Sequence, residues 1–151
     1  MKKFQFRLET LLKYREIKEE RAQLVFAEAD TIYRYEKSIL EKFAAILEDT
    51  LQRFYEKQKK SITAEELHLY NAYIVATENN ISIQTRKVIS AENHRQDCLQ
   101  KLEEAMKQRK LVENLKSKQL ERHYLEFLQE EQKYLDEIGT QRSVRGKVSV
   151  I

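Results

Sequence analysis

The feature that most constrains this chain is its lack of helix-breaking residues. The sequence has no proline, and neither of its two glycines precedes position 139 of the 151 residues. Proline and glycine are the residues that most often end helices and form tight turns. A chain that lacks them over so long a stretch is expected to form very long α-helices, and a sheet with tight turns is hard to build from it.

One short stretch, residues 60–67, carries signals for ending one helix and starting another. Thr63 followed by Glu66 has the pattern of a capping box, in which each side chain accepts a hydrogen bond from the other residue's backbone N–H. Just upstream, residues 56–60 (EKQKK) place cations where they favour the negative end of a helix dipole. The sequence therefore predicts a helix over about 4–58, a turn over about 59–62 and a helix over about 63–138. This is an all-α fold, a single long antiparallel two-helix coiled-coil hairpin.

Apolar residues repeat along the first predicted helix at coiled-coil spacing. With Leu8 at position a of a heptad, positions a, d and e are mostly apolar, with polar interruptions at Arg15, Lys18, Glu36, Thr50 and Arg53. The apolar set comprises Leu8, Leu11, Leu12, Ala22, Val25, Phe26, Ala29, Ile32, Tyr33, Ile39, Leu40, Phe43, Ile46, Leu47 and Phe54. This pattern predicts the surface that packs on the second helix.

The second predicted helix carries its own, weaker seam. Its a and d positions hold Leu67, Tyr70, Ile74, Thr77, Ile81, Val88, Ala91, Cys98, Leu102, Ala105 and Val112, interrupted by Gln84, Arg95 and Arg109. After Val112 the pattern is expected to slip to Leu111, Leu115 and Leu120 and to continue towards residue 138.

The second helix is expected to extend beyond the first by roughly 20 residues, or about 30 Å at 1.5 Å per residue. An antiparallel hairpin would bring Phe4 opposite a residue near 117 and leave about 118–138 without an intrachain partner. That segment carries Leu120, Tyr124, Leu125, Phe127, Leu128, Tyr134, Leu135 and Ile138. An apolar surface of this size predicts a partner interface. Gly139 suits the C′ position that ends a helix, so residues 139–151, with three cations and no acid, are expected to form a flexible basic tail.

Several function classes find little support in the sequence. The three histidines and Cys98 form no ligand set, there is no phosphate-binding loop, and a two-helix rod offers no cavity for chemistry, so we expect no enzyme, cofactor or metal. A net charge of +3 is too small to predict nucleic-acid binding, although Lys57, Lys59, Lys60 and the tail are basic. No apolar run is long enough to enter a membrane, and the N-terminus lacks a signal-peptide core.

Aromatic and aliphatic side chains also gather near the turn: Tyr55, Leu69, Tyr70 and Tyr73. Such residues can anchor a protein interface, or they can close the end of the hairpin by packing on one another. The sequence leaves both interpretations open.

Motifs at the two ends carry a family resemblance. The opening is Phe4-x-Phe6-x-Leu8-x-x-Leu11-Leu12-x-x-Arg15, and the closing is Glu131-Gln132-Lys133-x-Leu135-Asp136-Glu137-x-x-x-x-Arg142. The chain resembles the FliJ family, small coiled-coil proteins of the flagellar type III export apparatus. The resemblance implies a cytoplasmic protein of flagellum biogenesis and motility, peripherally associated with the inner face of the cell membrane at the flagellar base.

The resemblance also implies three kinds of partner: the hexameric export ATPase, whose assembly and activity the family promotes, the membrane export-gate protein, and export chaperones. The end that bears both termini would face the ATPase ring, through Phe4, Leu8, Leu11, Arg15, Gln132, Lys133, Leu135, Asp136, Glu137 and Arg142. The apolar segment adds Leu120, Tyr124, Phe127 and Leu128. The gate would contact the turn end, at Tyr55, Leu69, Tyr70 and Tyr73. Alternatives are the equivalent rod of a virulence type III secretion system and a homo-oligomeric coiled-coil scaffold.

Overall fold

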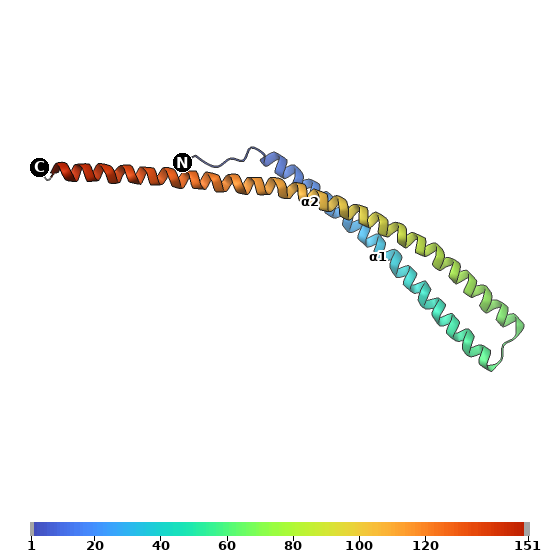
Figure 1. The fold of residues 1–151 in the computed structure, drawn as a ribbon. Helices are drawn as coiled ribbons and strands as arrows, with labels where there is room; N and C mark the ends of the chain where they lie inside the picture. Colours follow the sequence, from blue (N-terminus) through green and yellow to red (C-terminus); the bar gives the residue numbers. More distant parts are fainter. Residues whose placement is uncertain (1, 150–151) are drawn as a thin grey trace. The chain divides into compact units, whose positions relative to one another are not determined.

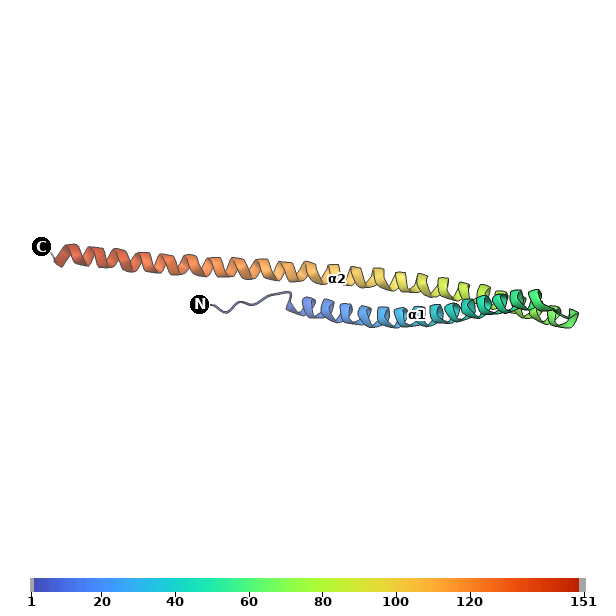
Figure 2. The same cartoon turned by 90° about the horizontal axis from the view of Figure 1, so that it is seen from below.

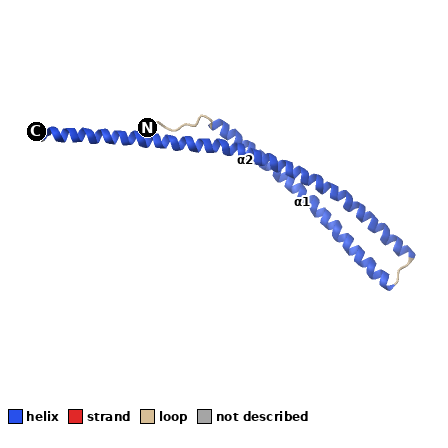
Figure 3. Cartoon of the chain, viewed as in Figure 1, coloured by secondary structure: helices blue, strands red, loops and turns tan. Residues whose placement is uncertain are grey.

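The computed structural model describes residues 2–149, which form two long helices and, over that range, no strand. Helix α1 spans Glu9–Lys60 and helix α2 spans Ala64–Ser149 (Figures 1 and 3). The helices run in opposite directions and pack against each other, which confirms the all-α helical hairpin (Figure 2). The chain divides into two compact units. One consists of Met1–Lys18 with Met106–Ile151 and the other of Glu19–Ala105, so each unit contains part of both helices.

The turn lies close to its predicted position, at residues 61–63. The Thr63 hydroxyl accepts a hydrogen bond from the backbone N–H of Glu66 at 3.2 Å, and the Thr63 carbonyl accepts one from Leu67 at 3.0 Å. Thr63 is therefore the N-cap of α2, as predicted. The Glu66 carboxylate forms an ion pair across the turn with Lys57, 3.2 Å away.

The first helix begins later than predicted, at Glu9 instead of about residue 4. Residues 2–6 are non-helical, and the N–H of Glu9 donates to the Phe6 carbonyl at 3.3 Å. An extended strand advances about 3.3 Å per residue against about 1.5 Å in a helix, so these residues reach further along α2. Phe4 lies against His123, with ring centroids 5.6 Å apart, and the His123 Nε2 donates to the Lys2 carbonyl at 3.1 Å. The expectation that Phe4 would face residue 117 was wrong.

The second helix ends later than predicted, and the flexible tail predicted to begin at Gly139 is helical as far as Ser149. Gly139 does not have a positive φ, and the Thr140 hydroxyl donates to the Asp136 carbonyl at 2.9 Å, one helical turn earlier. Glycine in a helix costs only about 1 kcal/mol relative to alanine, which is too little to stop a helix where no competing cap is formed. Residues 150 and 151 lie outside the described part of the chain.

The seam of α2 follows the predicted register. Tyr70 and the predicted a and d residues from Ile74 to Val112 are buried or half-buried, including the polar interruptions, whereas Leu67 is exposed. The slip expected after Val112 was wrong: Lys116 and His123 continue the same register towards α1, and Leu111, Leu115 and Leu120 are exposed.

The seam of α1 uses different heptad positions from those predicted. We call the residues of a helix that share one heptad position a column. Residues spaced alternately by three and four are buried or half-buried: Leu12, Arg15, Glu19, Ala22, Phe26, Ala29, Tyr33, Glu36, Leu40, Phe43, Leu47, Thr50 and Phe54. These are the predicted a and e positions. The predicted d position is mostly outside the seam, since Val25, Ile32 and Ile46 are 48%, 53% and 40% exposed.

Polar side chains within the unit of Glu19–Ala105 join the two helices at defined residues. The Gln84 side chain, which is buried, donates to the carbonyl and to the carboxylate of Glu36. Arg95 forms an ion pair with Asp30 at 3.0 Å and lies over the rings of Phe26 and Tyr33, at 5.9 and 5.1 Å. Partly buried pairs of this kind fix the register of a coiled coil.

Candidate interaction surfaces

A small apolar cluster attaches the N-terminal segment to α2. Phe6, Leu12 and Val112 are buried together, and Phe4 and Leu11 pack on them in part. Glu9 pairs with Lys116 at 2.8 Å, within the same unit of the chain. Phe4 and Leu11, which the resemblance assigned to the ATPase ring, therefore help to pack the N-terminal segment on α2.

Arg15 also has an intrachain partner. Its Nη1 donates to the backbone carbonyl of Gln108 at 2.8 Å, and the residue is half-buried. Of the four N-terminal residues assigned to the ring, only Leu8 is left mainly exposed, at 38%. The N-terminal part of the assigned site therefore holds the hairpin together, and its free surface is small.

Most of the apolar residues predicted on the unpaired end of α2 form one largely exposed stripe. We call this set the C-terminal stripe; it comprises Leu120, Tyr124, Phe127, Leu128, Tyr134, Leu135 and Ile138. Tyr124, Tyr134 and Leu135 are 57%, 63% and 58% exposed, and Phe127 and Ile138 are half-buried. Its members recur three, four or seven residues apart, which puts them on one side of the helix. Polar residues assigned to the same site by the family resemblance are exposed along this part of α2: Gln132, Lys133, Asp136, Glu137 and Arg142.

Of the C-terminal stripe, the N-terminal segment approaches Phe127. Lys2 shares a cavity of about 350 Å³ with His123, Glu126, Phe127 and Glu130. The extended N-terminus thus reaches further along α2 than predicted. The prediction that about 118–138 has no intrachain partner is therefore correct only in part. Tyr134 and Leu135, further along α2, keep most of their surface exposed.

The residues near the turn separate into two groups. Tyr70 is half-buried and packs on Phe54 of α1, with ring centroids 5.3 Å apart. Tyr55, Leu69 and Tyr73 are 60%, 68% and 51% exposed, and the Lys59 ammonium lies 4.5 Å from the centroid of the Tyr55 ring. The packing interpretation is confirmed for Tyr70. Tyr55, Leu69 and Tyr73 are exposed, and their role in an interface stays a prediction.

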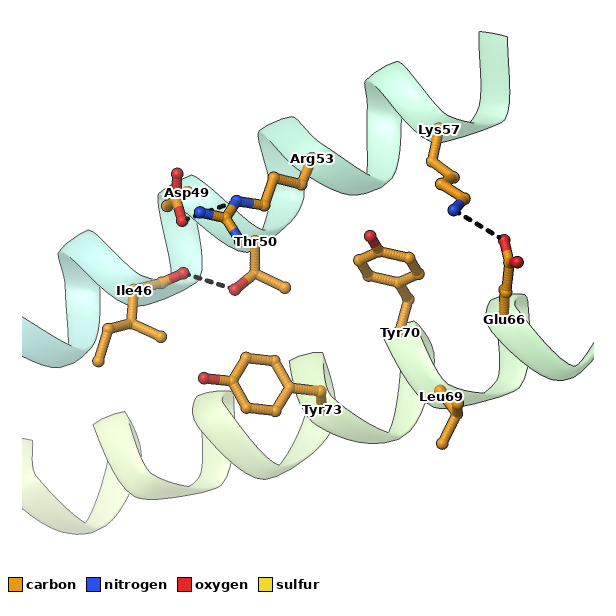
Figure 4. A pocket seen from close by; sticks show the side chains of 9 residues that line it. All are labelled: Ile46, Asp49, Thr50, Arg53, Lys57, Glu66, Leu69, Tyr70 and Tyr73. Atoms are coloured by element: carbon orange, nitrogen blue, oxygen red, sulfur yellow. Dashed lines mark hydrogen bonds and ion pairs between the residues drawn. The ribbon is translucent and has the colours of Figure 1, made fainter. Parts of the chain in front are cut away.

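An open groove of about 600 Å³ lies beside these residues, between α1 and α2 (Figure 4). Ile46, Asp49, Thr50, Arg53 and Lys57 line it from α1, and Glu66, Leu69, Tyr70 and Tyr73 line it from α2. Its charged members are already paired, Arg53 with Asp49 at 3.2 Å and Lys57 with Glu66. The groove is therefore suited to an apolar or aromatic side chain of a partner, with Leu69 and Tyr73 at its edge.

Of the histidine and cysteine side chains considered for chemistry, His94 and Cys98 lie close together. His94 Nε2 lies 3.7 Å from the sulfur of Cys98, one turn away on α2. Across residues 2–149 there is no set of three histidine, cysteine or acidic side chains that could hold a metal ion. No helix in the described range is both long enough and apolar enough to cross a membrane.

Comparison with known proteins gives the chain a family. A solved structure described as that of a putative YscO homolog, CT670, from Chlamydia trachomatis superimposes with a TM-score of 0.57; it is 18% identical, and the match covers 96% of this chain and 98% of that one. At this identity the similarity concerns the fold. No functionally curated protein matches the sequence. The family model described as "Flagellar FliJ protein" matches residues 4–147, nearly the whole chain. The chain therefore belongs to the FliJ family of flagellar type III export proteins.

Proposed function

We propose that this protein binds the hexameric export ATPase of the flagellum through the C-terminal stripe and promotes the assembly and activity of that ATPase. The observation that carries the proposal is the exposure of Tyr134 and Leu135 on the part of α2 beyond the reach of the N-terminal segment. Large exposed apolar surfaces of this kind typically mark protein interfaces. Membership of the FliJ family supports the choice of partner.

The proposed mechanism needs no catalytic group from this chain. One hairpin bound to a ring of six identical subunits contacts them unequally. Its binding free energy then differs between nucleotide states of the ring, and a ligand that prefers one state shifts the population towards it. The contacts would be the apolar side chains of the stripe, bordered by Lys133, Glu137 and Arg142.

The hydrolysis rate of the purified export ATPase, with and without this protein, tests the proposal. The double variant Phe127→Asp with Leu135→Asp should lose the stimulation, because each aspartate places a charge in an apolar contact. The matched control is Leu111→Asp, a leucine that is 67% exposed, against 58% for Leu135, on a different side of α2. Circular dichroism should show that both variants remain helical. Full stimulation by the double variant, or equal loss in the control, would contradict the assignment.

At the turn end, we propose that Tyr55, Leu69 and Tyr73 contact the membrane export-gate protein. The exposure of these three side chains beside the open groove supports this assignment. Tyr73→Ala with Leu69→Ala should weaken binding to the soluble part of the gate protein and leave ATPase stimulation unchanged. Loss of both activities together would mean that the variant had damaged the hairpin as a whole.

The remaining parts of the proposal are cellular. The protein would be cytoplasmic, held at the inner face of the cell membrane by the gate, and would escort export chaperones there. Family membership supports these statements. Binding of purified export chaperones to the chain, measured by titration, tests the escort role, and an absence of binding would contradict it.

Two other functions compete with the flagellar one. The fold shared with the putative YscO homolog supports an equivalent role in a virulence type III secretion system; stimulation of a virulence ATPase, but not of the flagellar one, would favour it. A coiled-coil scaffold would self-associate through the C-terminal stripe. Light scattering that gave the mass of a stable dimer or tetramer, together with no ATPase stimulation, would favour the scaffold.

A further inference from the structure

A row of branched apolar residues on α1 has no partner in the hairpin. Val25, Ile32, Ile39 and Ile46 recur every seven residues and lie outside the seam, with Ile39 half-buried and the others 40–53% exposed. All four belong to the unit of Glu19–Ala105. Over three heptads the row is about 30 Å long at 1.5 Å per residue. Two-stranded coiled coils bury two columns of each helix, so a third apolar column is typical of a helix that contacts a second neighbour.

On α2, the column next to this row carries two lysines, and the column beyond it carries Asp97 and Glu104. The Asp30–Arg95 and Glu36–Gln84 contacts set the register of the two helices. In that register Lys101, His94 and Lys87 lie across from Val25, Ile32 and Ile39, and all three side chains on α2 are exposed. We call the surface formed by the α1 row and these three α2 residues the lateral groove.

The hairpin has an open groove on this side. At its turn end, the α1 row reaches Ile46, which lines the open groove together with Tyr73 of α2 (Figure 4). Tyr73 belongs to the same column of α2 as Lys87, His94 and Lys101, since all are separated by multiples of seven residues. The open groove near the turn thus lies on the same side of the hairpin as the α1 row.

We propose that the lateral groove binds an amphipathic α-helix of a partner protein, with apolar residues against the α1 row and acidic residues against Lys87 and Lys101. Helices are recognised in this way through anchors one turn apart in a groove, and complementary charge sets the partner's orientation. The α1 row and the three α2 residues are not part of the two interfaces proposed above, although the turn end of the row adjoins the open groove beside Tyr73. The inference does not depend on the identity of the partners there.

A second copy of this chain fits the lateral groove less well than an acidic helix does. If a second copy packed its own α1 row into the lateral groove, the neighbouring column of its α1 would lie alongside. That column holds Arg21, Glu28, Lys42 and Asp49, whose charges cancel. Such a copy would bring no net negative charge to Lys87 and Lys101. An acidic partner helix would neutralise both lysines while burying the same apolar row.

Two matched synthetic peptides of 28 residues test the proposal. Both carry leucine at heptad positions a and d; one has glutamate at positions e and g, the other lysine, so like-charge repulsion keeps each monomeric. Titration of the full-length protein into each labelled peptide, followed by fluorescence anisotropy, should show tighter binding of the glutamate peptide. Ile32→Asp should weaken that binding at least tenfold. Lys87→Glu with Lys101→Glu should reverse the preference in favour of the lysine peptide.

The control is Leu24→Asp, because Leu24 is 67% exposed on α1 outside the row. It should bind the glutamate peptide as the unmodified protein does. Equal binding of both peptides, no binding, or equal loss in the Leu24→Asp and Ile32→Asp variants would overturn the proposal. So would binding that survives Ile32→Asp but is lost when Phe127 and Leu135 are replaced. A dimer in light scattering that Ile32→Asp dissociates would assign the groove to a second copy instead.

Discussion

Replacing Gly139 by alanine has an effect whose sign depends on where α2 ends. In the structure Gly139 is helical, its φ is not positive, and a Cβ built on it meets no atom within 4 Å. Alanine is favoured over glycine inside a helix by about 0.5–1 kcal/mol. Gly139→Ala should therefore stabilise the last turns of α2 by about that amount. If Gly139 were instead a left-handed C′ residue, alanine would cost about 1–2 kcal/mol there.

Amide hydrogen exchange followed by mass spectrometry can measure this effect locally. In the variant the amides of residues 136–146 should exchange about two- to fivefold more slowly, the factor that corresponds to 0.5–1 kcal/mol. Gly146→Ala is the matched control; it lies in the final turn, where helix ends fray, so its effect should be smaller. Faster exchange after residue 139 in the Gly139→Ala variant would refute the continuous helix and restore the flexible tail.

Three further substitutions test the packing. Leu12→Ala should cost about 2–3 kcal/mol in urea unfolding because Leu12 is only 4% exposed, whereas Leu8→Ala, at a 38% exposed site, should cost less than about 1 kcal/mol; equal costs would contradict the observed seam. Thr63→Ala should cost about 1 kcal/mol and speed amide exchange in the first turn of α2. Asp30→Ala should be more destabilising in the unmodified protein than in an Arg95→Met background, because without Asp30 the arginine loses its charge partner; a double-mutant cycle measures the difference.

Much of the fold could be predicted from the sequence because local signals agree. The capping residue Thr63 was identified from its spacing to Glu66, and the α2 seam from Ile74 to Val112 was identified from its heptads. Over this range the apolar residues of α2 fall mainly in two columns, so one face of this helix is indicated for the seam. That face can be predicted without knowledge of the partner helix.

The N-terminal segment was mispredicted although a signal was present. Phe4, Phe6 and Leu8 alternate with polar residues, and alternation with a period of two is typical of extended chain. The coiled-coil pattern that follows suggested that the helix began at once. Phe6 is buried against Leu12 and Val112, so tertiary contacts favour the extended form here. This segment also changes the candidate site, because it places Phe4 against His123 and Lys2 near Phe127 of the C-terminal stripe.

The α1 seam could not be assigned from α1 alone, because this helix has three apolar columns and any adjacent pair is a plausible seam. The choice depends on α2, where Arg95 pairs with Asp30 and lies over the rings of Phe26 and Tyr33. With these residues turned towards α2, the column of Val25 and Ile32 stays outside the seam. The same arrangement explains both the error in the sequence prediction and the existence of the lateral groove. A two-helix hairpin buries two columns of each helix, so a third apolar column on α1 is unsatisfied until a further helix covers it.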